Sequence, residues 1–389
     1  MKRRVLTFAG ALVALTVAAS HPFTGAQQTS PATWSAPLTP WGDPDLEGYS
    51  MTTTLSGARA LDKSASTALS SGGRPVRVQP AHFHHLHLNS LDPRAAIEYY
   101  ARAFSTVTKT RLAGFDGFTT TSRMSSGQGN VVVLISKTDT PPAIKPQSAI
   151  SHFGWNVPDS RAYLDKFHAL KLRVVPMYAD ADGTLVENSS DALPGYLTKA
   201  QIVDARSKGT KAVRKGGFHY LEGPDGALIE SYGDFPAERF THIHMYHSDP
   251  VCAQQWYARH LGATVAATHL HLGPGGPSGS GAGAQDCRRR FAEPTYPAFG
   301  PQGRVREPSG YILFDDVGLP MWPYDGPLVT TRRQTVDHIG LSVADLAATL
   351  ARLRAEGVKV IEQTYQWGNT RAAMIEGPDH VALELIEGN

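Results

Sequence analysis

The sequence predicts an α+β protein built from four copies of one module, in which a strand and a helix are followed by about three further strands. Two pairs of matching segments carry this prediction: one pair is 157 positions apart, and the other is 186 positions apart at its start and 154 at its end. Self-similarity at a fixed spacing indicates duplicated structural units. The modules therefore follow one another in the order A, B, A′ and B′.

The two A-type segments share His-x-His, then Asp-Pro, then Tyr-Ala-Arg. These residues are His85, His87, Asp92, Pro93 and 100–102 in the first copy, and His242, His244, Asp249, Pro250 and 257–259 in the second. The two B-type segments share His-x-Gly, a later Asp, and the ending Glu-Gly-Pro-Asp followed by another Glu. These residues are His152, Gly154, Asp159, 222–225 and Glu230 in the first copy, and His338, Gly340, Asp345, 376–379 and Glu384 in the second.

Each module is predicted to open with a strand around its histidine and to continue into a helix. The shared aspartate stands where a helix N-cap is needed, because its side chain can accept a hydrogen bond from the first helical turn. Apolar residues then recur at helical spacing, as at Ile97, Tyr100 and Phe104. The Gly-Pro-Asp turn precedes a last strand, expected over 226–232 in module B and 381–386 in module B′.

The N-terminus has the composition of a secretory signal. Residues 1–4 include three basic residues, 5–19 form an apolar run, and small residues stand at 18–20 and 24–26. We therefore predict a signal peptide over 1–26 and a periplasmic or secreted protein, with ordinary secretion and a twin-arginine route both open. The apolar run is too short to span a membrane. Residues 27–79, rich in Ser, Thr, Gly and Pro, are expected to form an arm rather than a domain.

Composition argues against binding to nucleic acid or to a membrane after cleavage. The net charge of +2 falls to about −1 without the three basic residues of the signal, and 19% charged residues are ordinary for a globular protein. We expect a small-molecule partner, and the oligomeric state is open. Cys252 and Cys287 either pair in an oxidising compartment or remain buried thiols. Long segments at 179–217, with a helix expected near 198–207, and at 273–284 are interpreted as site covers or as solvent-exposed connections.

This pattern resembles the vicinal oxygen chelate superfamily, which includes glyoxalase I, the extradiol ring-cleaving dioxygenases and the bleomycin and fosfomycin resistance proteins. The resemblance covers residues from about 81 to the C-terminus. It implies that the four βαβββ modules pair into two open barrel-like vicinal oxygen chelate domains, expected over 80–236 and 237–389. It also implies a metal held by a histidine on a first strand and an acid on a last strand.

Carried over residue by residue, the resemblance implies two sets of metal ligands. The first half is expected to supply His85, His152 and Glu230, and the second His242, His338 and Glu384. Side chains alternate between the faces of a strand, so residues on distant strands can point into one concave face. Two imidazoles and one carboxylate favour Fe(II), and Mn(II), Zn(II) and Ni(II) accept the same ligands. The late strands expected at 130–137 and 318–323 contain no carboxylate, which favours three protein ligands over the four of glyoxalase I.

Three further residues are candidates for catalysis. His87 and His244 lie two positions beyond proposed ligands and should face the same cavity, as acid or base groups, as fourth ligands, or as ordinary interior histidines. Tyr220 stands ten residues before Glu230, close to where extradiol enzymes carry a tyrosine that contacts the substrate. The histidines without a counterpart in another module are interpreted as surface or auxiliary residues: His82, His84, His247, His269 and His271.

The leading hypothesis is a metal-dependent enzyme that uses or chelates oxygen, with an Fe(II) extradiol-type dioxygenase as the specific form. Its substrate would dock two vicinal oxygens on the metal, which would acidify them. One alternative is a glyoxalase-type isomerase or lyase, which needs no O₂. The other is a periplasmic small-molecule-binding protein without activity, because a fold does not fix a function.

Overall fold

The structure, a computed structural model, describes residues 67–68, 76–122, 130–176, 178–179, 185–188, 208, 217–233, 235–265, 310–324 and 326–388. The expected signal peptide, most of the arm, the helix expected near 198–207 and the segment 273–284 lie outside these residues. So does Cys287, whereas Cys252 lies on a described helix and is disulfide-bonded. Among the described residues, no helix combines the length and the apolar character that a membrane span requires.

Each module has the predicted strand, helix and following strands. Module A consists of β3 (His82–Ser90), α1 (Pro93–Ala103), β4 (Thr108–Leu112), β5 (Phe115–Thr121) and β6 (Asn130–Lys137). Module B consists of β7 (Ile150–Asn156), α2 (Ser160–Ala169), β8 (Val174–Val175), β11 (Phe218–Glu222) and β12 (Leu228–Tyr232), with β9 (Tyr178–Ala179) and β10 (Leu185–Val186) inserted as a separate pair. The strand pair β1 (Thr67–Ala68) and β2 (Val76–Arg77) precedes module A.

The second half repeats this order. Module A′ consists of β13 (Arg239–His247), α4 (Pro250–Leu261), β14 (Thr264–Val265), β15 (Gly310–Phe314) and β16 (Val317–Pro323). Module B′ consists of β17 (Val336–Val343), α5 (Leu346–Ala355), β18 (Val360–Trp367), β19 (Thr370–Glu376) and β20 (Ala382–Glu387). The predicted α+β class with four βαβββ modules is confirmed.

The four module helices begin as predicted. Asp92, Asp159, Asp249 and Asp345 are the N-cap residues, and each side chain accepts a hydrogen bond from a backbone N–H of the first turn. The Asp92 bond, from the N–H of Ala95, is 3.0 Å long. Capping satisfies a donor that would otherwise have no partner, because the first N–H groups of a helix lack one within the helix.

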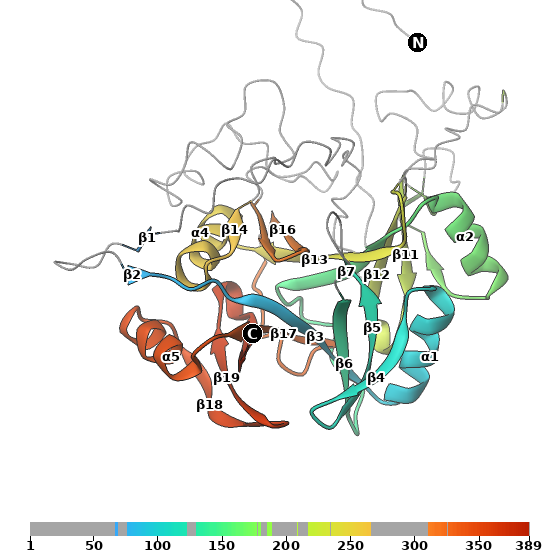
Figure 1. The fold of residues 1–389 in the computed structure, drawn as a ribbon. Coiled ribbons are helices and arrows are strands. Elements are labelled where there is room, and N and C mark those ends of the chain that lie inside the picture. Colours follow the sequence, from blue (N-terminus) through green and yellow to red (C-terminus); the bar gives the residue numbers. More distant parts are fainter. Residues whose placement is uncertain are drawn as a thin grey trace, which may run out of the picture. The chain divides into compact units, whose positions relative to one another are not determined.

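The strands form two eight-stranded sheets, and each sheet joins modules from different halves of the chain. The order is β18-β19-β20-β17-β3-β6-β5-β4 in one, called here the A–B′ sheet, and β14-β15-β16-β13-β7-β12-β11-β8 in the other, the B–A′ sheet. At the centre of each, two first strands pair antiparallel, β3 with β17 and β7 with β13. Figure 1 shows β3 in blue beside β17 in red, although they stand at opposite ends of the described sequence.

The predicted pairing of consecutive modules within 80–236 and 237–389 is therefore wrong. Each module presents a first strand of the same kind, and antiparallel pairing through that strand is equally available to a neighbour in sequence and to a distant module. The repeat pattern holds no signal that selects between them.

Side-chain alternation on the central strands separates a hydrophobic face from a histidine face. On β3, Leu86 and Leu88 belong to the main core, and His85 and His87 stand at the alternate positions. The core cluster includes residues of both sheets. Within it Phe104, after α1, stacks on Trp155 of β7 with ring centroids 4.0 Å apart. Modules A and B thus meet through hydrophobic packing, at roughly 1.5–3 kcal/mol per large buried side chain, rather than through their histidine faces.

The Gly-Pro-Asp turns provide a second link between the modules of one half. Asp225 and Asp379 adopt left-handed backbone conformations, with φ of 55° and 51°. The carboxylate of Asp225 accepts a hydrogen bond from the N–H of Leu91, at the end of module A's first strand. The Asp379 carboxylate accepts a hydrogen bond from the backbone N–H of Ser248, and it is also hydrogen-bonded to Nδ1 of the buried His247 ring. The turn therefore connects one module to the other. Of the two interpretations of His247, surface or auxiliary residue, the surface one is wrong because the side chain is buried.

Candidate metal centres

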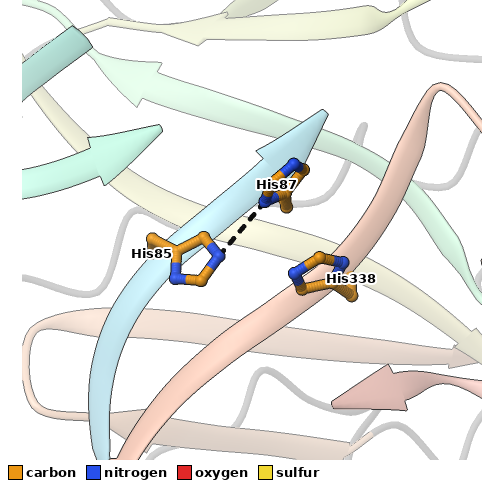
Figure 2. A group of neighbouring side chains, drawn as sticks. All are labelled: His85, His87 and His338. Atoms are coloured by element: carbon orange, nitrogen blue, oxygen red, sulfur yellow. Dashed lines mark hydrogen bonds between the residues drawn. The ribbon is translucent and has the colours of Figure 1, made fainter. Parts of the chain in front are cut away.

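His85, His338 and Glu384 come together on the concave face of the A–B′ sheet. The Nε2 atoms of both histidines point at the same carboxylate oxygen, Oε2 of Glu384, from 3.4 Å for His85 and 3.6 Å for His338. All three side chains are buried. Figure 2 shows His85 and His87 on one strand and His338 facing them from the neighbouring strand.

His152, His242 and Glu230 form a second group of the same kind in the B–A′ sheet. The Nε2 atoms of His152 and His242 lie 3.3 Å and 3.5 Å from Oε2 of Glu230. The three side chains are buried, and their ligand atoms lie within 4.8 Å of one another. Both groups therefore contain two imidazoles and one carboxylate.

All six predicted ligand residues are thus found in two groups, but the predicted grouping is wrong. His152 and Glu230 belong together, and their third member is His242 rather than His85. His85 instead joins His338 and Glu384. The physical reason is the pairing of β3 with β17 and of β7 with β13, which brings each A-type histidine against a B-type module of the other half.

The two groups fit a divalent metal ion. Protein ligands stand about 2.0–2.2 Å from a transition metal, so two ligand atoms on one ion are separated by roughly 3 Å or slightly more, as they are here. Oε2 of Glu230, Oε2 of Glu384 and Nε2 of His338 are buried and have no hydrogen-bond partner among the described residues. A buried carboxylate without compensation is costly. A cation at the point of convergence would compensate it.

The outer nitrogen of every ligand histidine is held by the side chain that precedes it in sequence. The distances from Nδ1 to the preceding side chain are 3.0 Å for His84–His85, 3.0 Å for Ser151–His152, 3.0 Å for Thr241–His242 and 2.7 Å for Asp337–His338. Such bonds orient a ligand imidazole and leave Nε2 for the metal. These four partners were not predicted, although a polar residue precedes each proposed ligand in the sequence. His84, interpreted from the sequence as a surface or auxiliary residue, is partly buried and has the auxiliary role of holding His85.

The glycine of each His-x-Gly motif leaves room for a histidine of the adjacent strand. Gly154 lies in register with His242, and a Cβ atom at position 154 would lie 2.6 Å from Cε1 of that ring. Gly340 lies in register with His85, and a Cβ atom there would overlap the His85 ring. The difference between His-x-His and His-x-Gly modules is thus steric: an A-type histidine occupies the space that the B-type glycine leaves open.

His87 and His244 line the two centres, as predicted from strand alternation. The ring of His87 stacks on His338 at 4.5 Å, its Nδ1 lies 3.4 Å from Nε2 of His85, and its Nε2 hydrogen-bonds Ser136 at 2.7 Å. Burial lowers the pKa of His87 well below its usual range, and the neighbouring His338 lowers that pKa further. His87 is therefore held neutral, and a neutral imidazole has one nitrogen that donates and one that accepts a hydrogen bond.

His244 occupies the equivalent place with a different partner. Its ring stacks on His152 at 4.8 Å, and its Nε2 accepts a hydrogen bond from the indole N–H of Trp322. An indole can only donate, whereas a serine hydroxyl donates or accepts. The two centres therefore differ in how freely this second imidazole can exchange protons.

A tyrosine stands against each glutamate, from a different strand in each sheet. Tyr220 lies directly across from Glu230 on paired strands, with its ring 5.3 Å from that of His152. In the A–B′ sheet Met374 takes the equivalent position, and Tyr365 on the next strand donates a hydrogen bond to Glu384 instead. Tyr365 was not predicted, because it has no counterpart at the matching repeat position.

Burial and neighbouring charge set the protonation of the A–B′ ligands. Burial lowers the pKa of His85 well below its usual value, and the nearby rings of His338 and His87 add to this effect. Burial also lowers the pKa of His338, but the hydrogen bond to Asp337 and the charge of Glu384 outweigh burial, so that pKa is raised. Asp337 itself is buried, yet its bond to His338 helps hold its pKa far below the usual value.

Aromatic and apolar side chains surround the A–B′ centre. Trp367 stacks on His85 at 5.8 Å, and Phe115 meets His87 edge to face at 4.9 Å. Trp367 packs in one hydrophobic cluster with Leu134, and Phe115 and Tyr365 lie against it. The candidate ligands of this centre are therefore enclosed by aromatic and aliphatic side chains.

Four βαβββ modules in two sheets, with histidines on first strands and glutamates on last strands, define the vicinal oxygen chelate fold. Residues 239–385, which cover module A′ and nearly all of module B′, match the family model described as the Glyoxalase/Bleomycin resistance protein/Dioxygenase superfamily. The match covers the second half of the chain, and the internal repeat extends the same strand, helix and motif pattern to modules A and B. The resemblance stated from the sequence is confirmed. No curated protein matches the chain.

Several solved structures are similar to this chain. Glyoxalase I from Zea mays has a TM-score of 0.49 and 11% identity over 79% of this chain and 92% of that one. A candidate dioxygenase from Bacillus subtilis has a TM-score of 0.45 and 9% identity over 80% of this chain and 86% of that one. A fosfomycin resistance protein from Listeria monocytogenes, solved with Mn(II), has a TM-score of 0.26 and 12% identity over 38% of this chain and 91% of that one.

Proposed function

We propose that this protein is an exported, metal-dependent enzyme that acts on a small molecule with two vicinal oxygens, as an extradiol-type dioxygenase using Fe(II). One observation carries the proposal: in each sheet two imidazole Nε2 atoms converge on one carboxylate oxygen within 3.3–3.6 Å. Two histidines and one carboxylate with open positions are typical of non-haem Fe(II) oxygenases. The export part of the proposal is supported by residues 1–26 alone.

His85, His338 and Glu384 would hold the ion in one centre, and His152, His242 and Glu230 in the other. The bound metal would supply a Lewis acid that orients two adjacent oxygens of the substrate and makes them more acidic. The remaining steps fall to the protein. Its side chains orient the substrate, exclude water and move protons.

His87 is suited to accept a proton from the substrate. Burial and the neighbouring His338 lower its pKa, so its ring is neutral near pH 7. Ser136, hydrogen-bonded to Nε2, can relay or replace that proton because a hydroxyl both donates and accepts. A positioned imidazole base contributes about 10²–10⁴-fold to a rate.

Tyr365, Trp367 and Phe115 favour an aromatic diol as the substrate class at the A–B′ centre. Burial raises the pKa of Tyr365 and the adjacent Glu384 carboxylate raises it further, so the phenol remains a neutral donor. Its hydrogen bond to Glu384 orients that ligand. The rings of Trp367 and Phe115, packed on His85 and His87, would flank a planar ring.

A glyoxalase-type isomerase or lyase is the second candidate. It is favoured by one observation, the proximity of His87 Nδ1 to His85 Nε2 at 3.4 Å, which permits a fourth protein ligand. A cage of four ligands leaves fewer open positions and suits chemistry that needs no O₂.

The decisive experiment loads the purified protein with Fe(II) without oxygen and then measures O₂ uptake with a panel of catechols. Uptake that requires both metal and catechol supports the dioxygenase. The matched control is the double variant Glu230→Gln, Glu384→Gln, which should bind no metal and consume no O₂. Metal-dependent turnover of a 2-oxoaldehyde–thiol adduct without O₂ would instead establish the isomerase. Tight catechol binding without turnover would establish a binding protein.

A further inference from the structure

The two centres have the same ligands but differ in the side chain behind one of them. Asp337 precedes His338, and Ser151 precedes His152 at the equivalent repeat position. Both contact Nδ1 of the ligand that follows, Asp337 at 2.7 Å and Ser151 at 3.0 Å. The A-type ligands, by contrast, have neutral partners in both centres, His84 behind His85 and Thr241 behind His242. Asp337 is thus the one carboxylate among these four partners.

Asp337 is held rigidly in its position. It is 4% exposed, and its Oδ2 accepts hydrogen bonds from the Asn89 side chain at 2.9 Å and from the backbone of Arg333 at 2.7 Å. The guanidinium of Arg332 donates to Oδ1, the same oxygen that binds His338. Every contact fixes the carboxylate against the imidazole.

The positive charge of Arg332 only partly offsets the carboxylate. Its other nitrogen donates to Glu362 at 2.7 Å, so the guanidinium is shared between two carboxylates, and its Nη1 lies 3.4 Å from Nδ1 of His338. Arg332 and Glu362 are 34% and 42% exposed, so water screens both charges, whereas Asp337 is buried beside the ring of His338. The charged atom nearest to Nδ1 of His338 is therefore a carboxylate oxygen, Oδ1 of Asp337 at 2.7 Å.

We propose that the A–B′ centre binds a divalent metal more tightly than the B–A′ centre, and that Asp337 is the positioning residue responsible. The inference rests on the proposed function only in assuming that both centres bind metal. A carboxylate accepts and never donates at neutral pH, so it holds the proton on Nδ1 and leaves the Nε2 lone pair for the metal. It also makes the imidazole a stronger ligand. A serine hydroxyl can donate to Nδ1 as readily as it can accept from it. Serine therefore neither fixes the proton on Nδ1 nor makes the imidazole a stronger ligand.

The test is a competition between the metal-free protein and a chromophoric chelator for Co(II) or Zn(II). We expect two classes of site that differ about 10–100-fold in affinity, the range found when outer partners of metal ligands are changed. Glu384→Gln should remove the tight class and Glu230→Gln the weak class. One class of two equal sites would overturn the proposal, as would loss of the tight class in Glu230→Gln.

Two reciprocal variants assign the difference to Asp337. Asp337→Ser should lower the tight class to the affinity of the weak one, and Ser151→Asp should raise the weak class by a similar factor. Ser151 is only partly buried, so its variant tests the effect even if Asp337→Ser unfolds, which circular dichroism would show. Unchanged affinities in folded variants would overturn the role of Asp337. Binding of no metal would overturn both this inference and the proposed function, whereas unequal binding without O₂ uptake would overturn only the dioxygenase.

Discussion

Gly340 and His85 stand opposite each other on paired strands, and the imidazole of His85 occupies the space where any other residue at position 340 would place its Cβ atom. Gly154 and His242 repeat this relationship in the other sheet. The glycine is therefore part of the centre, although it offers no ligand atom. Its role is to let a histidine of another module lie flat across the strand.

Gly340→Ala should displace His85 and lower metal binding from two ions per chain to one. Interiors are close-packed, so a ring buried on all sides has no free space into which it can turn. Metal content after dialysis measures the effect. Gly154→Ala serves as the matched control, because it should empty the other centre and leave the first intact. Full metal content in both variants would show that the rings move aside without loss of binding.

The cross-half grouping predicts how ligand substitutions combine. His85→Ala with Glu384→Gln damages one centre only, so the double variant should keep one metal per chain. His85→Ala with Glu230→Gln damages both centres and should keep none. Metal analysis of the two folded proteins distinguishes the two groupings. If the grouping expected from the sequence were right, the His85→Ala, Glu384→Gln protein would keep no metal and the His85→Ala, Glu230→Gln protein would keep one.

His87→Gln should retain metal at the A–B′ centre but lower kcat about 10²–10⁴-fold, as loss of a general base does. The measurement belongs in the Glu230→Gln background, where only this centre is loaded. Ser136→Ala is the companion variant and should cause a smaller loss, because His87 keeps its place through its stacking on His338. Loss of metal in His87→Gln would indicate a fourth ligand and favour the isomerase.

Buried His219 should make the protein less stable in acid. Both ring nitrogens lack a hydrogen-bond partner among the described residues, and burial lowers the pKa of His219 from 6.5 to about 3. In the unfolded chain the His219 imidazole is protonated below about pH 6.5, whereas in the folded protein it is protonated only below about pH 3. The free energy of unfolding falls as the pH is lowered through this window and is unaffected above it.

His219→Phe should flatten this dependence in the metal-free protein, since phenylalanine takes no proton and can pack on Phe167 as the imidazole does. Urea unfolding of both proteins at pH 7.5 and pH 4.5 gives the difference. All other titrating groups are common to the two proteins and cancel. An equal pH dependence in both would contradict the assignment.

Asp379→Ala should destabilise the link between modules A′ and B′ by about 1–3 kcal/mol, the cost of leaving partners of a charged acceptor unsatisfied. The substitution removes the hydrogen bonds to Ser248 and His247. It also places alanine at a left-handed backbone position, which aspartate and asparagine adopt more readily. Asp379→Asn is the control, because asparagine tolerates this backbone and keeps an acceptor oxygen. Equal stability of all three proteins by thermal unfolding would show that core packing alone joins the modules.

Local patterns in the sequence predicted the modules and the ligand residues. The N-cap aspartates, the histidine face of each first strand and the acid on each B-type last strand depend on chain-local geometry, namely helix capping and the two-residue period of a strand. For that reason His85 and Glu384 could be named without knowledge of their partners. The polar residues that precede the candidate ligands, such as Asp337, could have been predicted by the same local geometry. They were missed because a different residue type stands at this position in each module.

Only the tertiary structure decided which modules share a sheet, and hence which histidines share a glutamate. Strand pairing is non-local, and first strands of the same kind give the sequence no means of distinguishing β3–β17 from β3–β7. The structure also decided the unequal surroundings of the two centres, since Tyr365 and Arg332 reach Glu384 and Asp337 from elsewhere in the fold. The sequence determined the candidate ligand residues, and packing over long sequence distances determined which of them lie together.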